Sequence, residues 1–157
     1  MKVNPEKDLK GILYKVKNPA QYVGGEYGAR IFNEERLLKI GLCFPDLYEI
    51  GMSNLAIRLI YNRLNNLENV QCERVFLPDL DYYDLLKQNR VDLYTLESGI
   101  PLNQLDFLLF SVGYELSATN ILAVLEAGGI PCKNKERGVS DPIIIAGSPA
   151  LTNPIPF

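Results

Sequence analysis

Four apolar runs of strand length divide the chain from residue 37 onward. The runs LLKIGLCF, VQCERVFL, FLLFSVGY and PIIIAG are nearly continuous rather than alternating, which is typical of strands covered on both faces. They occupy residues 37–44, 70–77, 107–114 and 142–147. The pattern therefore predicts a sheet that is buried between two layers.

Apolar residues recur at helical spacing between these runs. We predict helices over residues 52–66, 79–88 and 118–127, with Ser117 as the N-terminal cap of the last and a glycine pair at its end. Residues 92–102 read as a short strand and a Ser-Gly turn. Alternating strands and helices predict an α/β fold, with an open, mainly parallel sheet and flanking helices.

Residues 1–36 are more polar and contain a turn-rich centre, PAQYVGGEYG. We interpret them as an N-terminal extension with one short helix over residues 6–13, ahead of an α/β domain that spans residues 37–157. The sequence stops soon after the last apolar run, so we expect this domain to be a fragment of a longer polypeptide.

The composition mainly excludes certain classes of protein and partner. The 157 residues are 47% hydrophobic and 22% charged, with a net charge of −3, which is ordinary for a soluble globular domain. There is no basic run to favour a nucleic-acid partner, and no apolar stretch of the ~18–20 residues that a membrane span needs. The N-terminus has no long apolar region like that of a signal peptide, so we expect a cytoplasmic protein without a membrane partner.

The chain contains no histidine and three widely spaced cysteines, Cys43, Cys72 and Cys132. Ser-His or Cys-His catalysis and imidazole metal sites are therefore excluded within this chain. The cysteine spacing fits neither a disulfide framework nor a zinc site.

Parallel α/β sheets bind ligands beyond the carboxyl ends of their strands. In this sequence those ends read PDLYEIG, SVGYELS and AGSPALTNP. Their glycine, proline, serine and asparagine content suits a binding rim, but such residues also serve simply to turn the chain. Both interpretations stay open from the residues alone.

The common nucleotide motifs are missing. No G-x-G-x-x-G follows the first strand and no G-x-x-x-x-G-K-[ST] occurs, so dinucleotides and nucleoside triphosphates are not expected ligands. A phospho-receiver domain would need an aspartate after the third long strand and a lysine after the last. The sequence has Ser111-Val112-Gly113 and Ala146-Gly147-Ser148 at these places.

The loop Asp46-Leu47-Tyr48-Glu49-Ile50-Gly51 reads D-x-Y-x-x-G, which resembles the D-x-H-x-x-G loop of cobalamin-binding α/β domains. Over residues 19–157 the chain looks like the N-terminal domain of cobalamin-type radical SAM proteins. The matching segments are PAQYVGGEYG, FPDLYEIGMSNLAIRLIYNRLN, ERVFLPDLDYYDLL, LYTLESGIPL, SVGYELSATNILAVLEAGGIP and IIIAGSPALTNPIPF.

This resemblance implies a cobalamin-binding-like fold of Rossmann or flavodoxin type. It also implies, as partner, a radical SAM barrel in the same polypeptide. The barrel's C-x-x-x-C-x-x-C cysteines would hold an iron–sulfur cluster that cleaves S-adenosylmethionine. That motif is missing from this chain, which is therefore not expected to be catalytic alone.

The resemblance further implies a set of cofactor-binding positions and no catalytic or metal-ligating residue. These positions are Asp46, Tyr48, Gly51, Ser111, Gly113, Gly147 and Ser148. Tyr48 stands where related proteins place the histidine that binds cobalt, and a phenol with a pKa near ~10 is a poor neutral ligand. Any cobalamin is therefore expected to be base-off, without a protein ligand.

Several alternatives stay open. Asp46 caps a turn or accepts bonds from a corrin amide, and Gly51 permits a positive φ or a close approach of a helix. The domain as a whole either binds cobalamin above the barrel or is a degenerate, cofactor-free module for docking or substrate recognition. A stand-alone small-molecule binder of flavodoxin-like shape is a third hypothesis.

Overall fold

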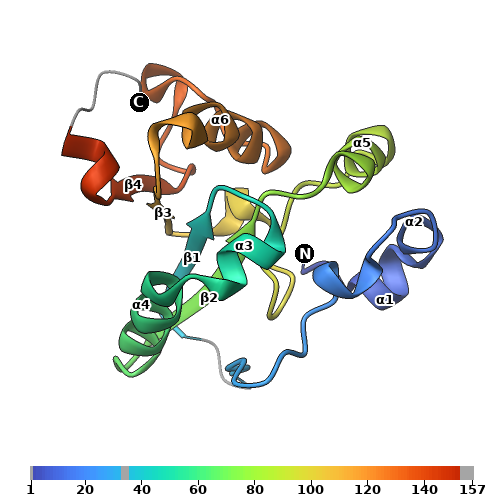
Figure 1. Ribbon diagram of the computed structural model, residues 1–157, viewed down its shortest axis with the longest axis horizontal. Coiled ribbons are helices and arrows are strands. Elements are labelled where there is room, and N and C mark those ends of the chain that lie inside the picture. Colours follow the sequence, from blue (N-terminus) through green and yellow to red (C-terminus); the bar gives the residue numbers. More distant parts are fainter. Residues whose placement is uncertain (1, 33–35, 153–157) are drawn as a thin grey trace.

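The computed structural model describes residues 2–32 and 36–152 and contains one sheet of four strands. These are β1 (Leu38–Phe44), β2 (Val70–Phe76), β3 (Phe107–Ser111) and β4 (Ile143–Gly147). Their order is β2-β1-β3-β4, and every neighbouring pair is parallel (Figure 1). The predicted α/β class is confirmed, and the arrangement is Rossmann-like.

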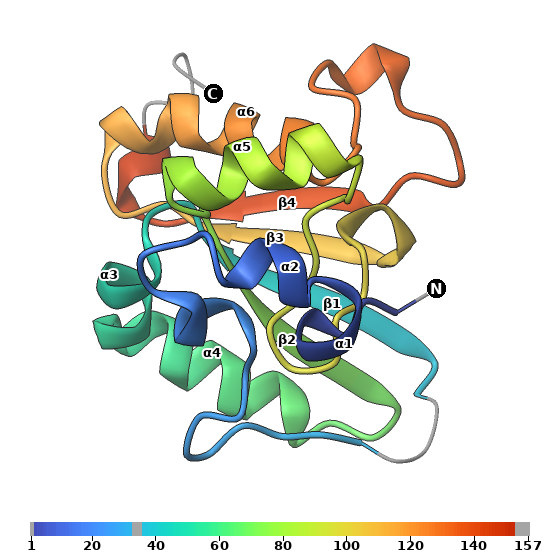
Figure 2. The ribbon, with the colours of Figure 1, turned by 90° about the vertical axis from the view of Figure 1, so that its right-hand side faces the viewer.

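Helices cover both faces of the sheet. Helices α5 (Leu80–Asn89) and α6 (Ala118–Ala127) lie on the face that is turned toward the viewer in Figure 2. Helix α4 (Leu55–Asn65) packs Ile57 and Tyr61 on the other face, against β1 and β2. Short 3-10 turns complete the fold: η1 (Pro19–Tyr22), η2 (Leu102–Gln104), η3 (Glu115–Ser117), η4 (Asn134–Glu136) and η5 (Pro149–Thr152).

The N-terminal segment lies on the same face as α5 (Figure 2). It forms α1 (Pro5–Asp8) and α2 (Lys10–Leu13), and Leu9 ends one helix and precedes the next. Its buried apolar side chains belong to the larger core cluster, together with Tyr82 and Leu86 of α5. Residues 2–32 therefore supply part of this core. The division of the chain at residue 36 stays a prediction, and residues 153–157 lie outside the described residues.

Four predicted elements differ from the structure. The single helix predicted over residues 6–13 is divided at Leu9 into α1 and α2. The single helix over 52–66 is divided into α3 (Tyr48–Ser53) and α4, because the Asn54 side chain caps α4 by accepting bonds from Ala56 N and Ile57 N. Residues 92–102 make the predicted turn, with Gly99 at φ +68°, but in place of a strand they form only one isolated bridge, between Tyr94 and Pro101. The strand over 107–114 ends at Ser111.

The end of α6 confirms one prediction and its start contradicts another. Gly129 has φ +67°, and Ile130 N donates to Leu125 O at 2.9 Å, so the glycine pair ends the helix as expected. Ser117 precedes the helix, but its side chain makes no capping bond. Its hydroxyl is instead buried without a partner among the described residues. The prediction that Ser117 is the cap is wrong because its backbone is already helical, with φ −71° and ψ −6°.

Candidate functional site

The strand order places a switch point between β1 and β3. The chain leaves β1 through α3 and α4 toward β2, whereas it leaves β3 through α6 toward β4. The loops after β1 and β3 therefore leave the sheet in different directions, and open α/β sheets bind ligands at such a point. Five of the seven predicted site residues lie at this edge on the ends of β1, β3 and β4: Asp46, Ser111, Gly113, Gly147 and Ser148.

Asp46 lies at the centre of this edge and is 8% exposed. One carboxylate oxygen accepts from Leu47 N at 2.8 Å, and the other accepts from the Tyr114 hydroxyl at 2.6 Å. That hydrogen bond raises the pKa of Tyr114. The backbone oxygen of Asp46 accepts from Leu77 N at 3.0 Å, just after β2. Asp46 thus serves as a turn cap that joins three strand ends, and both of its carboxylate oxygens have partners.

A second hydrogen bond crosses the switch point. Asn120, in the first turn of α6, donates from Nδ2 to Pro45 O at 2.9 Å. Together with the bond between Tyr114 and Asp46, it ties the loop after β3 to the loop after β1. Sequence reasoning assigned Asn120 no role, and only its place in the helix after a strand end could have suggested one.

The other site residues at this edge come from β3 and β4. Ser111 is paired in register with Gly147. The Ser148 hydroxyl donates to Val112 O and accepts from Ala150 N, so it fastens the end of β4 to the end of β3. Gly147 has open space where a Cβ would lie, and Gly113 has only the Phe44 ring within contact distance. The two glycines leave exposed backbone at the rim.

Tyr48 and Gly51 lie elsewhere, against β2. The Tyr48 ring packs edge-on against Phe76, with centroids 5.5 Å apart, and its hydroxyl donates to Glu26 Oε1 at 3.1 Å. Burial raises the pKa of Tyr48 to about 12. A Cβ on Gly51 would come within 2.3 Å of the Phe76 ring, so this glycine permits a close approach rather than a positive φ. The structure therefore does not bring these two residues together with the other five.

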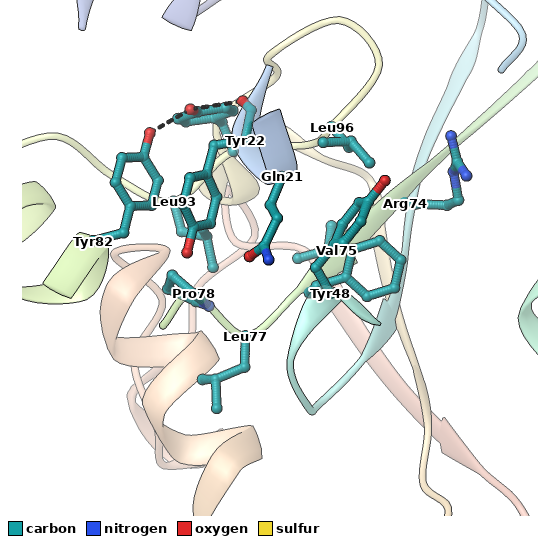
Figure 3. A pocket seen from close by; sticks show the side chains of 12 residues that line it. Gln21, Tyr22, Tyr48, Arg74, Val75, Leu77, Pro78, Tyr82, Leu93 and Leu96 are labelled. Atoms are coloured by element: carbon teal, nitrogen blue, oxygen red, sulfur yellow. Dashed lines mark hydrogen bonds between the residues drawn. The ribbon is translucent and has the colours of Figure 1, made fainter. Parts of the chain in front are cut away.

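Tyr48 instead helps to line a small pocket (Figure 3). Gln21 and Tyr22 from the N-terminal segment close it, and the Tyr22 ring stacks on Tyr82 with centroids 3.9 Å apart. The cavity is only about 30 Å³, the volume of a single water molecule. A corrin cannot occupy it.

A buried charged cluster borders this pocket. Arg74 on β2 pairs with Glu97 Oε1 at 2.6 Å and with Glu26 Oε2 at 3.2 Å. Burial raises the pKa of Glu97 to about 7, against the lowering effect of Arg74. Nearby, the Glu73 carboxylate accepts from Thr95 and Ser98 side chains. Sequence reasoning missed this cluster, although two adjacent charges within the apolar run VQCERVFL were its signal.

The cluster is no metal centre. Within residues 2–32 and 36–152, no group of three or more cysteine, aspartate or glutamate side chains could hold a metal ion. The same part of the chain contains no helix that is both long and apolar enough to cross a bilayer.

Comparison with known families decides the family. Residues 56–157 match the model for the N-terminal region of radical SAM proteins. The chain belongs to this radical SAM N-terminal family. No curated protein and no solved structure matches it. The matched region begins in α4, so the loop with Asp46, Tyr48 and Gly51 precedes it.

Membership of this family makes the chain an accessory domain of a radical SAM protein. The switch point of the accessory domain is bridged by two hydrogen bonds, and its rim offers glycine backbone and apolar side chains. Such a rim can dock against another surface, but it presents no acid–base pair or nucleophile in an open cleft.

Proposed function

We propose that this accessory domain covers the active site of a radical SAM barrel with the rim at the carboxyl ends of its strands. The observation that supports this proposal is the apolar character of the rim. Large apolar side chains stand exposed near the start of the helices that follow three strands: Ile50, Leu55, Leu80, Tyr114 and Leu116. Exposed apolar residues that gather at one rim are typical of a protein interface.

The polar groups of the rim favour docking over chemistry. The side chains of Asp46, Asn120 and Ser148 form hydrogen bonds with neighbouring loops. These bonds hold the rim in one shape. A preformed surface loses little conformational freedom when it binds. The iron–sulfur cluster and S-adenosylmethionine belong, in this proposal, to the barrel.

A matched pair of variants in the intact radical SAM protein tests this docking. Leu116 lies on the rim and is 81% exposed, whereas Leu37 precedes β1 at the opposite edge and is 78% exposed. We expect amides 112–118 to exchange hydrogen more slowly in the intact protein than in this chain alone. Leu116→Asp should remove that protection and Leu37→Asp should not. Equal exchange of these amides in both proteins would refute the docking.

Cobalamin is a second candidate for the same rim. The residues do not fit a histidine-type site, because position 48 is a tyrosine whose hydroxyl bonds to Glu26. They fit a base-off cofactor without a protein ligand better, because Gly113 and Gly147 leave exposed backbone over β3 and β4. When bound, cobalamin would supply a cobalt centre that can carry a methyl group.

Retention of hydroxocobalamin tests this second candidate. The chain is mixed with excess cofactor and gel-filtered, and its visible spectrum is recorded. We expect retained absorbance with a base-off spectrum. Gly147→Leu should reduce retention by filling the open space, whereas Gly11→Leu, an equally open position on α2, should not. A colourless protein would leave the cofactor-free docking module as the function.

A further inference from the structure

The outer edge of β4 is open. Ile143 N and Gly147 O bond toward β3, so the N–H and C=O groups of Ile144 and Ala146 point away from the sheet. No residue in the described part of the chain pairs with these outward groups. An unpaired edge of this kind is a template for a further strand.

An apolar groove runs beside this edge on the face that carries α6. It has a volume of about 600 Å³, within the range of protein binding sites. Ile144 and Ala146 of β4 form one wall, and Ile121, Leu122 and Leu125 of α6 form the other. Leu122 is 50% exposed, so α6 has an apolar flank that no described residue covers.

The opposite face of β4 is equally uncovered. Ile143 is 59% exposed and Ile145 is 48% exposed, because α4 packs on β1 and β2 instead. Parallel sheets are normally covered on both faces. The strand β4 is therefore accessible along its outer edge and on the face of Ile143 and Ile145, whereas Ile144 packs partly against the larger core cluster beside the groove.

One border of the groove carries a net positive charge. The segment 132–137, CKNKER, supplies Asn134 and Arg137 to the groove and carries three basic residues against one acid. Arg137 is fixed there by bonds to Pro131 O at 2.8 Å and Cys132 O at 2.9 Å. A segment that fills the groove therefore meets positive charge at its border and is complemented by an acidic residue.

We propose that the open edge of β4 pairs with a further β-strand from the radical SAM portion of the protein. Such a strand would bond to the outward groups of Ile144 and Ala146. Its side chains would alternate between the α6 groove and the face of Ile143 and Ile145, with a carboxylate near Arg137. The inference rests on the proposed function for its partner, but it concerns a different surface from the carboxyl-end rim.

Residue-resolved hydrogen exchange tests the pairing. In this chain alone we expect the amides of Ile144 and Ala146 to exchange rapidly and those of Ile143 and Ile145 to be protected by β3. In the intact radical SAM protein all four should be protected, and the two outward amides should slow by about 100-fold or more, as in a paired strand.

Two outcomes would overturn the proposal. One is equal exchange of the Ile144 and Ala146 amides in the two proteins. The other is slowing in this chain alone that rises with concentration together with a dimer mass, because a second copy would then occupy the edge. The rim variant Leu116→Asp separates this test from the docking test, because it should leave the β4 amides protected even where rim protection is lost.

A charge reversal tests the acidic partner. Lys135 lies in the sequence between Asn134 and Arg137, and both of these residues line the groove. Lys135→Glu should lower the protection of the two outward amides about 2–5-fold at low salt, as expected for one partly screened charge. Lys10→Glu, on α2, is the matched control. Equal effects of the two variants would contradict a specific acidic contact at the groove.

Discussion

The two edge strands of the sheet, β2 and β4, have opposite surroundings. All seven residues of β2 are buried, whereas four of the five residues of β4 are exposed. Both strands lie at an edge, and β2 is the less apolar of the two because it contains Gln71, Glu73 and Arg74, so neither apolar content nor position in the sheet explains why β2 is the more buried. The two edges differ in whether other described residues bond to the backbone N–H and C=O groups that point away from the sheet.

The outward groups of β2 are bonded by side chains and loops. The Asn65 side chain on α4 donates to Cys72 O and accepts from Cys72 N, both at 2.9 Å. Arg74 N donates to Glu97 at 2.7 Å, and Arg74 O accepts from Leu96 N at 2.9 Å. The amide of one asparagine and the loop 92–102 thus replace a neighbouring strand, which protects this edge from pairing with another molecule.

The domain therefore bonds the outward backbone groups of β2 with its own residues, whereas no described residue bonds those of β4. An edge that the chain satisfies with its own residues contributes to folding, whereas an edge left open is available to a partner. If this difference is real, substitutions at the buried groups of β2 should destabilise the domain strongly and substitutions on the open face of β4 should not.

The largest effect should come from Arg74. Arg74→Met leaves the fully buried Glu97 side chain without its cation, and we expect the free energy of unfolding to fall by about 3–5 kcal/mol in urea titrations. The double variant Arg74→Met/Glu97→Gln should lose less than the sum of the two single losses, because the buried Glu97 charge is removed together with its cation, although Glu26 still loses its pair with Arg74. Additive losses would show that the pair is not coupled.

Asn65 should have the next largest effect. Asn65→Ala removes both bonds to the Cys72 backbone, which stays buried, and should cost about 2–3 kcal/mol of unfolding free energy. Asn62→Ala, on the exposed side of the same helix, should change stability by less than about 0.5 kcal/mol. If the two variants lose the same stability, the asparagine does not seal the edge.

Glu97 gives a pH dependence that only the β2 edge should show. The pKa of Glu97 is about 7 in the folded protein, whereas its ordinary value is 4.5. Between pH 4.5 and 7 the folded state therefore keeps a proton on Glu97 that the unfolded state has lost. The free energy of unfolding therefore receives a contribution that falls as pH rises from about 4.5 to 7 and is constant above. Since each unit of pKa shift corresponds to ~1.4 kcal/mol, we expect about 1–2 kcal/mol between pH 5 and 7.

The matched variant for this pH dependence is Glu97→Gln, which cannot titrate. The unfolding free energy of the unsubstituted protein minus that of Glu97→Gln should fall by about 1–2 kcal/mol as the pH is raised from 5 through 6 to 7. A difference that does not change with pH would mean that Glu97 titrates normally.

The amino-acid sequence predicted the sheet more fully than the site. The four continuous apolar runs gave strands within a few residues, because burial on both faces leaves a strong pattern. The break at Asn54 was missed because Met52 and Leu55 continue the helical spacing across it. Ser117 was misjudged because cap residues are recognised by type, whereas capping requires a backbone conformation that the sequence does not reveal.

The sequence predicted only part of the candidate site correctly, and there is a physical reason for this. Topology alone brings the ends of β1, β3 and β4 together, so Asp46 and Ser148 were found at one edge. Tyr48 and Gly51 are turned toward Phe76 by α3, which motif reasoning could not foresee. The cluster around Arg74 depends on contacts across 22 to 48 residues, beyond the range of any local pattern.

The smallest effect should come from β4. Ile145 is half-exposed on the face that α4 leaves open, so Ile145→Ala removes few contacts. In this chain alone it should cost less than about 1 kcal/mol, whereas Leu42→Ala on β1, where the side chain is 1% exposed, should cost about 2–5 kcal/mol. In the intact radical SAM protein the cost of Ile145→Ala should rise toward that of a buried residue. A cost that stays small in both proteins would mean that this face of β4 remains uncovered, and that the difference between the two edges does not serve a partner there.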